Sequence, residues 1–132
     1  MKSLTTALIF FFVFNLSFSQ VTDAVEQFAL DASVSESSGL IYYNGKIITH
    51  NDSGNPNELY EMNPSSPTIT RIVTVTGATN VDWEDITQDG DYIYIGDFGN
   101  NVSGNRTDLK IYKISKADYL STTSVTAETI AF

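Results

Sequence analysis

From about residue 36 onward, short segments in which apolar and polar residues alternate are separated by turn signals. Asn44-Gly45 separates one pair of such segments, and Asp89-Gly90 separates another pair further along the chain. A dipeptide of this kind between two alternating segments is typical of a β-hairpin turn, whose residues need positive φ angles. No later window shows a sustained helical period, and residues 115–121 could form a turn of helix but are more simply interpreted as a loop. The pattern therefore predicts an all-β chain.

The two hairpins belong to one repeat, because similar residues recur around them in the same order. Four pairs of segments match: 36–40 with 82–86 (offset 46), 44–45 with 89–90 and 52–55 with 97–100 (offset 45), and 59–62 with 111–114 (offset 52). The seven additional residues of the second repeat fall within the polar segment 101–108. Insertions that are confined to a loop are expected of a structural repeat.

Each repeat supplies four predicted strands. They cover residues 38–43, 46–51, 58–63 and 68–76 in the first repeat, and 83–88, 91–96, 109–115 and 125–132 in the second. Four strands in a period of 45–50 residues are typical of a β-propeller blade. A β-sandwich also has many short strands, but it does not require the same elements to recur in order. We therefore predict two four-stranded propeller blades, over about 36–77 and about 82–132.

Two blades cannot close a ring, because a propeller needs about four to eight of them. The last predicted strand also runs to the final residue, Phe132. We therefore expect an incomplete ring, with the remaining blades of the full-length protein following this segment. Residues 21–30 are a candidate outer strand that would close the ring against the last blade.

The first 19 residues have the layout of a secretory signal peptide. Lys2 supplies a positive start, residues 7–14 form a compact apolar core, and Ser17 and Ser19 place small residues before a cleavage site. The apolar run is shorter than the ~20 residues of a membrane-spanning helix. We expect cleavage after Ser19, a mature domain over residues 20–132, secretion to the extracellular space or cell surface, and no membrane association after cleavage.

The charge balance narrows the range of partners. The chain carries 7 basic and 16 acidic residues, a formal net charge of −9 at pH 7. Such a surface repels nucleic acid and anionic lipid, because both are bound through basic groups that neutralise phosphates. It attracts cations. The sequence contains no cysteine, which excludes disulfides and thiolate metal sites.

Blade topology places the acidic residues on one rim. The connection that enters each blade and the loop after its second strand lie on the same face of the disc. Residues with oxygen ligands in these connections are Glu36, Asn51, Asp52, Asp82, Glu84, Asp85, Asp97, Asn100 and Asn101. Carboxylate, amide and carbonyl oxygens are the ligands that Ca²⁺ and Mg²⁺ prefer. The candidate metal ligands are Glu36, Asp52, Asp82, Glu84, Asp85 and Asp97, with Ca²⁺ as the candidate ion.

Asp52 and Asp97 also have an interpretation that needs no metal. Each precedes a glycine by two positions, so its carboxylate can bond its own loop while Gly54 or Gly99 supplies a positive φ. Several carboxylates on one rim repel one another, however, unless a cation or protons intervene. Loop formation and metal binding both remain open at this point.

Two further residues have a structural and a chemical interpretation. Trp83 packs between blades if the acids beside it only cap the strand entrance. Alternatively, Glu84 or Asp85 is a metal ligand or a general base at the channel mouth. His50 is the only histidine, so a multi-histidine zinc site is excluded, and a structural role is favoured over a catalytic one.

The motifs together resemble a known group of proteins. The segments that carry the likeness are 36–40 (ESSGL), 50–54 (HNDSG), 82–86 (DWEDI) and 96–101 (GDFGNN). They resemble secreted propeller-like proteins of Bacteroidetes-type bacteria, many of which carry a sorting domain for type IX secretion. The resemblance covers nearly the whole mature chain and implies further blades. More distantly, the layout is similar to calcium-dependent propeller hydrolases of the lactonase and phytase-like groups, although no catalytic residue can be matched.

Three functions are compatible with these features. The first is a secreted, calcium-stabilised propeller module that binds a small-molecule, glycan or protein ligand. The second is a metal-dependent hydrolase that acts on a phosphoester or lactone, with the rim acids holding the ion. The third is a carbohydrate-binding surface on which tyrosines or Trp83 stack, although Tyr92 and Tyr94 share one strand face and are more typical of inter-blade core. Whether the protein is an enzyme stays open.

Overall fold

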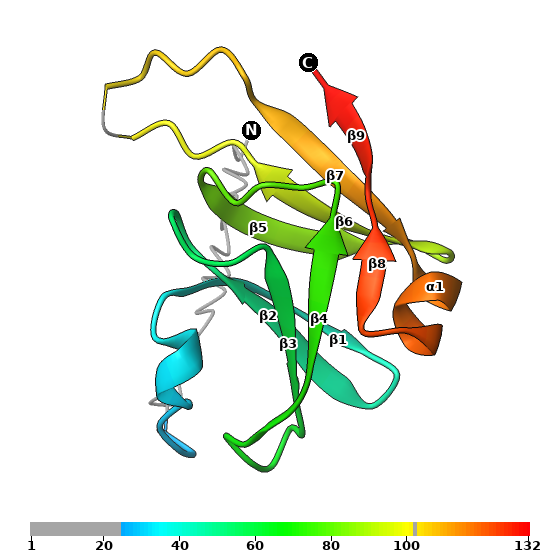
Figure 1. Cartoon of the computed structure of the whole chain (residues 1–132). Coiled ribbons are helices and arrows are strands. Elements are labelled where there is room, and N and C mark those ends of the chain that lie inside the picture. Colours follow the sequence, from blue (N-terminus) through cyan, green and yellow to red (C-terminus); the bar gives the residue numbers. More distant parts are fainter. Residues whose placement is uncertain (1–24, 102) are drawn as a thin grey trace, which may run out of the picture.

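The computed structural model describes residues 25–101 and 103–132 and is almost entirely β-structure (Figure 1). Its elements are a 3-10 helix η1 (Ala32–Val34), β1 (Ser37–Tyr43), β2 (Lys46–Asn51), β3 (Glu58–Met62), β4 (Ile69–Thr76), β5 (Trp83–Gln88), β6 (Tyr92–Asp97), β7 (Lys110–Ser115), α1 (Lys116–Ser121), β8 (Ser124–Thr126) and β9 (Glu128–Ala131). The predicted signal peptide lies outside the described residues. Within those residues, no helix is both long and apolar enough to cross a membrane.

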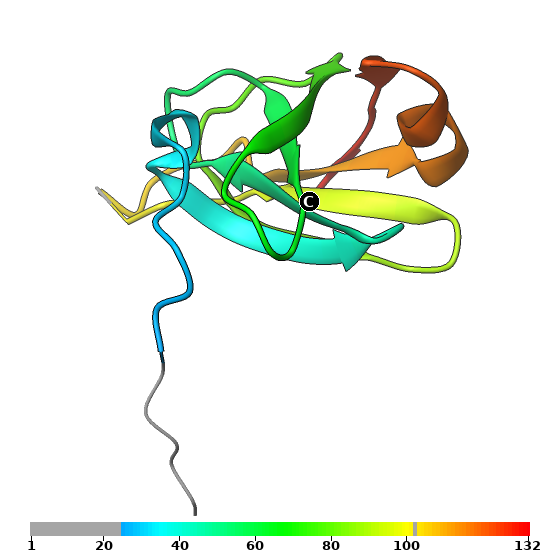
Figure 2. The same ribbon diagram turned by 90° about the horizontal axis from the view of Figure 1, so that it is seen from below.

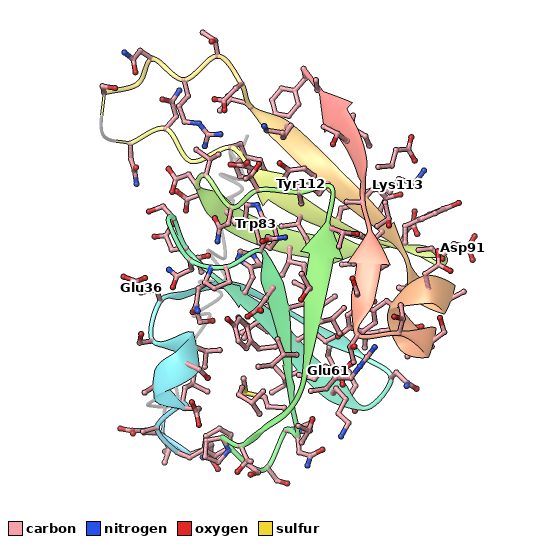
Figure 3. All side chains as sticks on the ribbon, in the orientation of Figure 1. Glu36, Glu61, Trp83, Asp91, Tyr112 and Lys113 are labelled. Atoms are coloured by element: carbon pink, nitrogen blue, oxygen red, sulfur yellow. The ribbon has the colours of Figure 1, made fainter. Side chains whose placement is uncertain are left out.

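The strands form two sheets that share one hydrophobic core. The first sheet has the order β1-β2-β3-β4-β8 and the second the order β5-β6-β7-β9. The first strands of the two sheets, β1 and β5, lie next to each other. Trp83 and Tyr112 of the second sheet lie between the sheets in Figure 3, in a cluster with Ile48, Leu59 and other buried residues of the first sheet. The predicted β-structure is confirmed, but the two sheets have five and four strands, whereas two four-stranded sheets were predicted.

The hairpin register shows how the two sheets correspond. The paired residues Ser37↔Asn51, Gly39↔His50 and Ile41↔Ile48 in the first hairpin are equivalent to Trp83↔Asp97, Asp85↔Gly96 and Thr87↔Tyr94 in the second. Both hairpins carry an irregularity at the same place, before Gly39 and before Asp85. The offset is therefore 46 throughout the hairpin, and Asn51, rather than Asp52, is the counterpart of Asp97. The predicted offset of 45 is wrong, whereas the offset of 52 for the third strand is confirmed, since Tyr60 and Tyr112 pair with equivalent residues.

The two hairpin turns differ in geometry. Asn44 and Gly45 both have positive φ angles, 48° and 77°, as the sequence predicts. Asp89-Gly90 was expected to form the same turn, but neither residue has a positive φ. Instead, the Asp89 carboxylate accepts the N–H groups of Asp91 and Tyr92, both at 2.8 Å, and fixes the turn through its side chain.

The C-terminal region departs most from the predicted strands. Residues 116–121 form helix α1 instead of a loop, and the Ser115 hydroxyl accepts the N–H of Asp118 at its start. The predicted strand 125–132 is divided at Ala127, because the chain after α1 runs along the edge of the first sheet before it returns to the second sheet. As a result β8 pairs in parallel with β4, and only β9 pairs with β7.

Residues 21–24 of the candidate outer strand 21–30 lie outside the described residues, so that strand stays a prediction. Residues 25–31 have no regular structure and extend away from the sheets in Figure 2. After this segment, Val34 of η1 is buried with Tyr60 and Met62 on the face of the first sheet that points away from the second sheet.

Candidate metal centre

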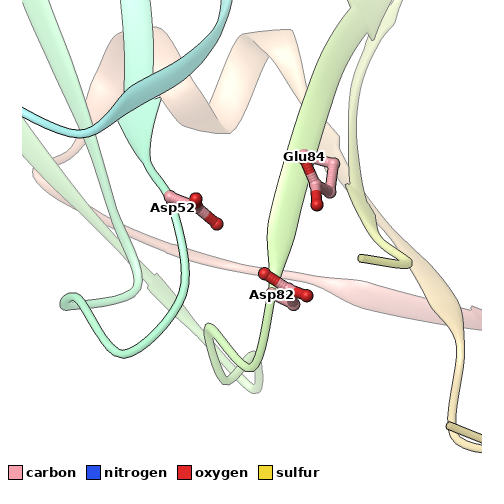
Figure 4. Close-up of side chains that lie close together, drawn as sticks. All are labelled: Asp52, Asp82 and Glu84. Atoms are coloured by element: carbon pink, nitrogen blue, oxygen red, sulfur yellow. The ribbon is translucent and has the colours of Figure 1, made fainter. Parts of the chain in front are cut away.

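Three carboxylates from the two sheets converge at one end of the molecule. Asp52 directly follows β2, Asp82 directly precedes β5, and Glu84 lies within β5. One oxygen from each lies within 4.8 Å of the others, and the side chains point toward a common space (Figure 4). All three residues are half-buried. The arrangement lets one cation contact a carboxylate oxygen from each residue.

The strand directions place these residues together. Glu36, just before β1, and Asp91, in the hairpin turn before β6, lie at opposite ends of the molecule in Figure 3. The entrance to each sheet and the end of its second strand are therefore at the same end. The backbone N–H of Asp52 donates to the carbonyl of Glu36 at 2.8 Å, which closes this end of the first sheet.

Asn80 fixes the Asp52 loop against the second sheet. Its side-chain amide donates to the carbonyls of Asn51 and Asp52, at 3.0 and 2.8 Å, and its side-chain oxygen accepts the N–H of Trp83 at 3.1 Å. One residue thus holds both sides of the carboxylate cluster in place. The sequence analysis missed Asn80, because nothing in the chain near it marks a contact with a loop almost thirty positions earlier.

Gly99 allows the carboxylates of Asp82 and Glu84 to pack directly on the backbone. A Cβ atom built on Gly99 would overlap the carboxylate of Asp82 and Oε1 of Glu84. The N–H of Gly99 also donates to the carbonyl of Asp82 at 3.1 Å. Gly99 was expected to supply a positive φ and does not, so its small size is the property that matters. Gly54 has the expected positive φ of 75°.

Burial and charge repulsion destabilise the ionised cluster. Burial raises the pKa of Asp82 above its usual value, and the neighbouring Asp52 raises it further, while the charge of Arg106 acts in the opposite direction. The pKa of Glu84 is also raised, first by burial and then by the charges of Asp82 and Asp52. Carboxylates in this state gain stability from a proton or from a cation.

Asp97 lies beside the three carboxylates but has a different role. It is fully buried, and its Oδ1 accepts the backbone N–H of Asp82 and the guanidinium of Arg106, both at 3.0 Å. Arg106 also donates to the carbonyl of Gly99 at 2.8 Å and to Asp108 at 3.0 Å. Asp97 therefore holds the loop after β6. Its other oxygen, Oδ2, has no hydrogen-bond partner among the described residues.

The remaining predicted ligands lie outside the cluster. Glu36 is exposed and accepts a hydrogen bond from the side chain of Asn55 at 2.5 Å. Asp85 is exposed and accepts the N–H of Ile86 at 2.8 Å. Of the six candidates, the structure brings Asp52, Asp82 and Glu84 together. Asp52 also accepts the N–H of Ser53 at 2.5 Å, so loop formation and cation binding are compatible there.

His50 and Trp83 meet at the interface between the sheets. The His50 ring is fully buried and its Nδ1 lies 3.2 Å from the Ser38 hydroxyl and 3.1 Å from the carbonyl of Asn51. The ring centres of His50 and Trp83 are 5.6 Å apart in an edge-on arrangement. Trp83 is fully buried, and its indole N–H donates to the carbonyl of Thr79 at 3.0 Å. Both residues thus have the packing role favoured by the sequence.

Comparison with known proteins identifies no relative: no family model, no curated protein and no solved structure matches the chain. The resemblance to secreted propeller-like proteins stays a prediction.

Proposed function

We propose that this protein is a secreted module of β-propeller type that binds Ca²⁺ between its two sheets and presents a ligand- or partner-binding rim. The observation that carries the cation site is the convergence of Asp52 from the first sheet with Asp82 and Glu84 from the second. An ion bound there joins the two sheets, so its binding energy adds to their packing.

The chemistry of the cluster favours a hard divalent cation. Ca²⁺ takes six to eight oxygen ligands in flexible geometry, whereas Mg²⁺ demands a near-ideal octahedron and keeps several waters. Three carboxylates that approach from the two sheets suit the more flexible ion. Zn²⁺ is disfavoured because its sites are built mainly from histidine and cysteine, and the cluster contains neither.

The propeller arrangement is supported by how the sheets correspond. Equivalent strands carry equivalent registers, and β1 lies beside β5. The face of the second sheet that packs on the first is equivalent to the far face of the first sheet. Such head-to-tail packing of like units generates rings when the rotation closes.

Metal-dependent hydrolysis of a phosphoester or lactone is a second candidate. It is favoured by the partial exposure of the three carboxylates, which leaves coordination positions open to water or substrate. A cation there would polarise a substrate oxygen or lower the pKa of bound water. Assay of the mature protein with chromogenic phosphoesters and lactones, with Ca²⁺ and with chelator, tests this function separately from ion binding.

Thermal melting of the mature protein tests the cation site. Because a ligand that binds only the folded state stabilises it, Ca²⁺ at 100 times its dissociation constant adds about 2.7 kcal/mol. The midpoint should therefore rise by about 10 °C or more over the chelator-treated protein, at roughly 4–8 °C per kcal/mol for a small domain. Asp52→Asn should abolish most of this rise.

Asp85→Asn is the matched control. It removes the same charge one position from Glu84, but Asp85 is exposed and outside the cluster. Its variant should keep the full response to Ca²⁺. An unchanged midpoint in the wild-type protein, or equal loss of the response in both variants, would contradict the proposed site.

A further inference from the structure

The first sheet has one face that is already covered by the second sheet. Its residues include Ile41 of β1, Ile48 of β2 and Leu59 of β3, all in the shared core. Trp83 of the second sheet belongs to the same cluster, lies edge-on to His50, and accepts the Ser38 hydroxyl at its carbonyl at 2.7 Å. This interface shows what the repeat places on that face: a large aromatic side chain from the next sheet.

The equivalent face of the second sheet is not covered by any described residue of another sheet. The counterparts of Ile41, Ile48 and Leu59 are Thr87, Tyr94 and Ile111. These three residues line one open groove, together with Gly96 and Phe98. Ile111 pairs directly with Ile130 on β9, which is 40 % exposed, so the apolar surface continues to the edge of the sheet.

Phe98 takes the place that His50 has in the first sheet. The counterpart of His50 is Gly96, and a Cβ atom on Gly96 would overlap the ring of Phe98. The ring thus lies over the glycine, at the edge of the same groove, and is 38 % exposed. The second sheet therefore presents an aromatic ring at the position where His50 meets Trp83.

We propose that the groove formed by Thr87, Tyr94, Gly96, Phe98 and Ile111 is the docking surface for a further four-stranded sheet of the same repeat, which inserts an aromatic residue equivalent to Trp83. The residues of this groove occupy the same register positions in the second sheet as the residues of the first sheet that pack against the second sheet. The inference rests on the propeller arrangement proposed above and names the partner of the second sheet. It does not depend on whether the cluster binds Ca²⁺.

The test uses the mature chain and an extended chain in which a second copy of residues 77–132 follows Phe132. Trp83 is the only tryptophan of the natural sequence and is fully buried, so its emission should resist quenching by acrylamide. The extended chain carries a second tryptophan, in the added sheet. If that sheet docks in the groove, the quenching constant of the extended chain should equal that of the mature chain.

Ile111→Asp should open the second tryptophan to quenching, with an increase of several-fold in the accessible fraction. Ile72→Asp is the matched control, because Ile72 is 43 % exposed and lies on the opposite face of the first sheet. Circular dichroism of the mature chain with each substitution verifies folding. If Ile111→Asp prevents folding, Phe98→Ser, in a loop, replaces it.

Two results would overturn the proposal. One is an extended chain in which about half of the emission is open to acrylamide. The other is equal quenching with Ile111→Asp and Ile72→Asp. Sedimentation of the mature chain tests whether a second copy of the chain occupies the groove instead. That occupant would be assigned if the mature chain is a dimer that Ile111→Asp dissociates and if the second tryptophan of the extended chain is open to quenching. The Ca²⁺ response of the mature chain is measured independently, so failure of either proposal is recognised on its own.

Discussion

At the scale of single residues, burial shifts the pKa values of neighbouring groups in opposite directions. It lowers the pKa of His50 below its usual 6.5, and this effect outweighs the nearby charges of Asp85 and Asp52. It raises the pKa values of Asp82 and Glu84, and repulsion within the cluster acts in the same direction. In each case the folded protein favours the uncharged form.

His50 should make the protein less stable in acid. Because its pKa is lower in the folded than in the unfolded state, the unfolded chain binds more protons below pH 6.5. The free energy of unfolding should fall by up to about 1.4 kcal/mol per pH unit as the pH drops from 6.5 toward the folded-state pKa. Urea unfolding at pH 5 to 8 should show this slope in the wild type and lack it in His50→Gln. Parallel curves for the two proteins would contradict the assignment.

The acidic cluster should behave oppositely when no cation is bound. Since the pKa values of Asp82 and Glu84 are raised, ionisation of both above those values destabilises the fold. Asp52→Asn removes one repelling charge, so in chelator at pH 7 the variant should be more stable than the wild type. The gain should be about 1 kcal/mol, the energy of two charges about 4 Å apart in water. Urea unfolding in chelator measures it, and a less stable variant would show that the cluster does not repel itself.

The acids of the site could be placed at one rim from sequence, but their convergence could not be predicted. Alternation and turn signals orient the strands, and this puts Asp52, Asp82 and Glu84 at the same end. Which oxygens meet depends on the hydrogen bonds of Asn80 and on the small size of Gly99. Neither contact has a local signal in the chain.

At the scale of elements, the strands followed from alternation, whereas the alignment of the repeats did not. The similarity of residues 52–55 to 97–100 suggested an offset of 45, but the register requires 46. Backbone hydrogen bonds fix the register, so a motif in the following loop can shift by one residue without changing the sheet. The same shift explains why Gly90 is not the counterpart of Gly45.

This difference predicts unequal responses of the two glycines. Gly45 has a φ of +77°, while Gly90 lies outside that region, and a Cβ atom would meet no neighbour at either position. Gly45→Ala should therefore destabilise the protein by about 1–2 kcal/mol through the backbone alone. Gly90→Ala should change stability by less than about 0.5 kcal/mol, as is usual for surface substitutions. Denaturant unfolding of both variants tests the prediction, and equal effects would refute the assigned turn geometries.

At the scale of the whole molecule, α1 ties the C-terminal half of the chain to the first sheet. Tyr119 of α1 is fully buried and its hydroxyl donates to Glu61 of β3 at 2.8 Å. Arg71 of β4 also donates to Glu61, at 2.8 Å, and to the carbonyls of Tyr119 and Thr122. These contacts bring β8 beside β4. A helix of six residues is too short to show a periodic pattern, so the sequence favoured a loop over the helical turn and did not predict the divided last strand.

The buried hydroxyl of Tyr119 should contribute measurably to stability. Tyr119→Phe leaves the ring in place but removes the donor to Glu61, so it should lower the free energy of unfolding by about 1.5–3 kcal/mol, the range for hydrogen bonds to charged groups. Tyr42→Phe is the control, because Tyr42 is 62 % exposed. If both variants unfold at the same denaturant concentration, α1 is not held by this contact.

The proposed cation site between the two sheets is tested most directly by diffraction from crystals of residues 20–132 grown with Ca²⁺. An anomalous difference map should contain one strong peak between Asp52, Asp82 and Glu84, at 2.3–2.6 Å from an oxygen of each. A map without that peak, at a Ca²⁺ concentration that raises the melting midpoint, would place the ion elsewhere and contradict the proposed site.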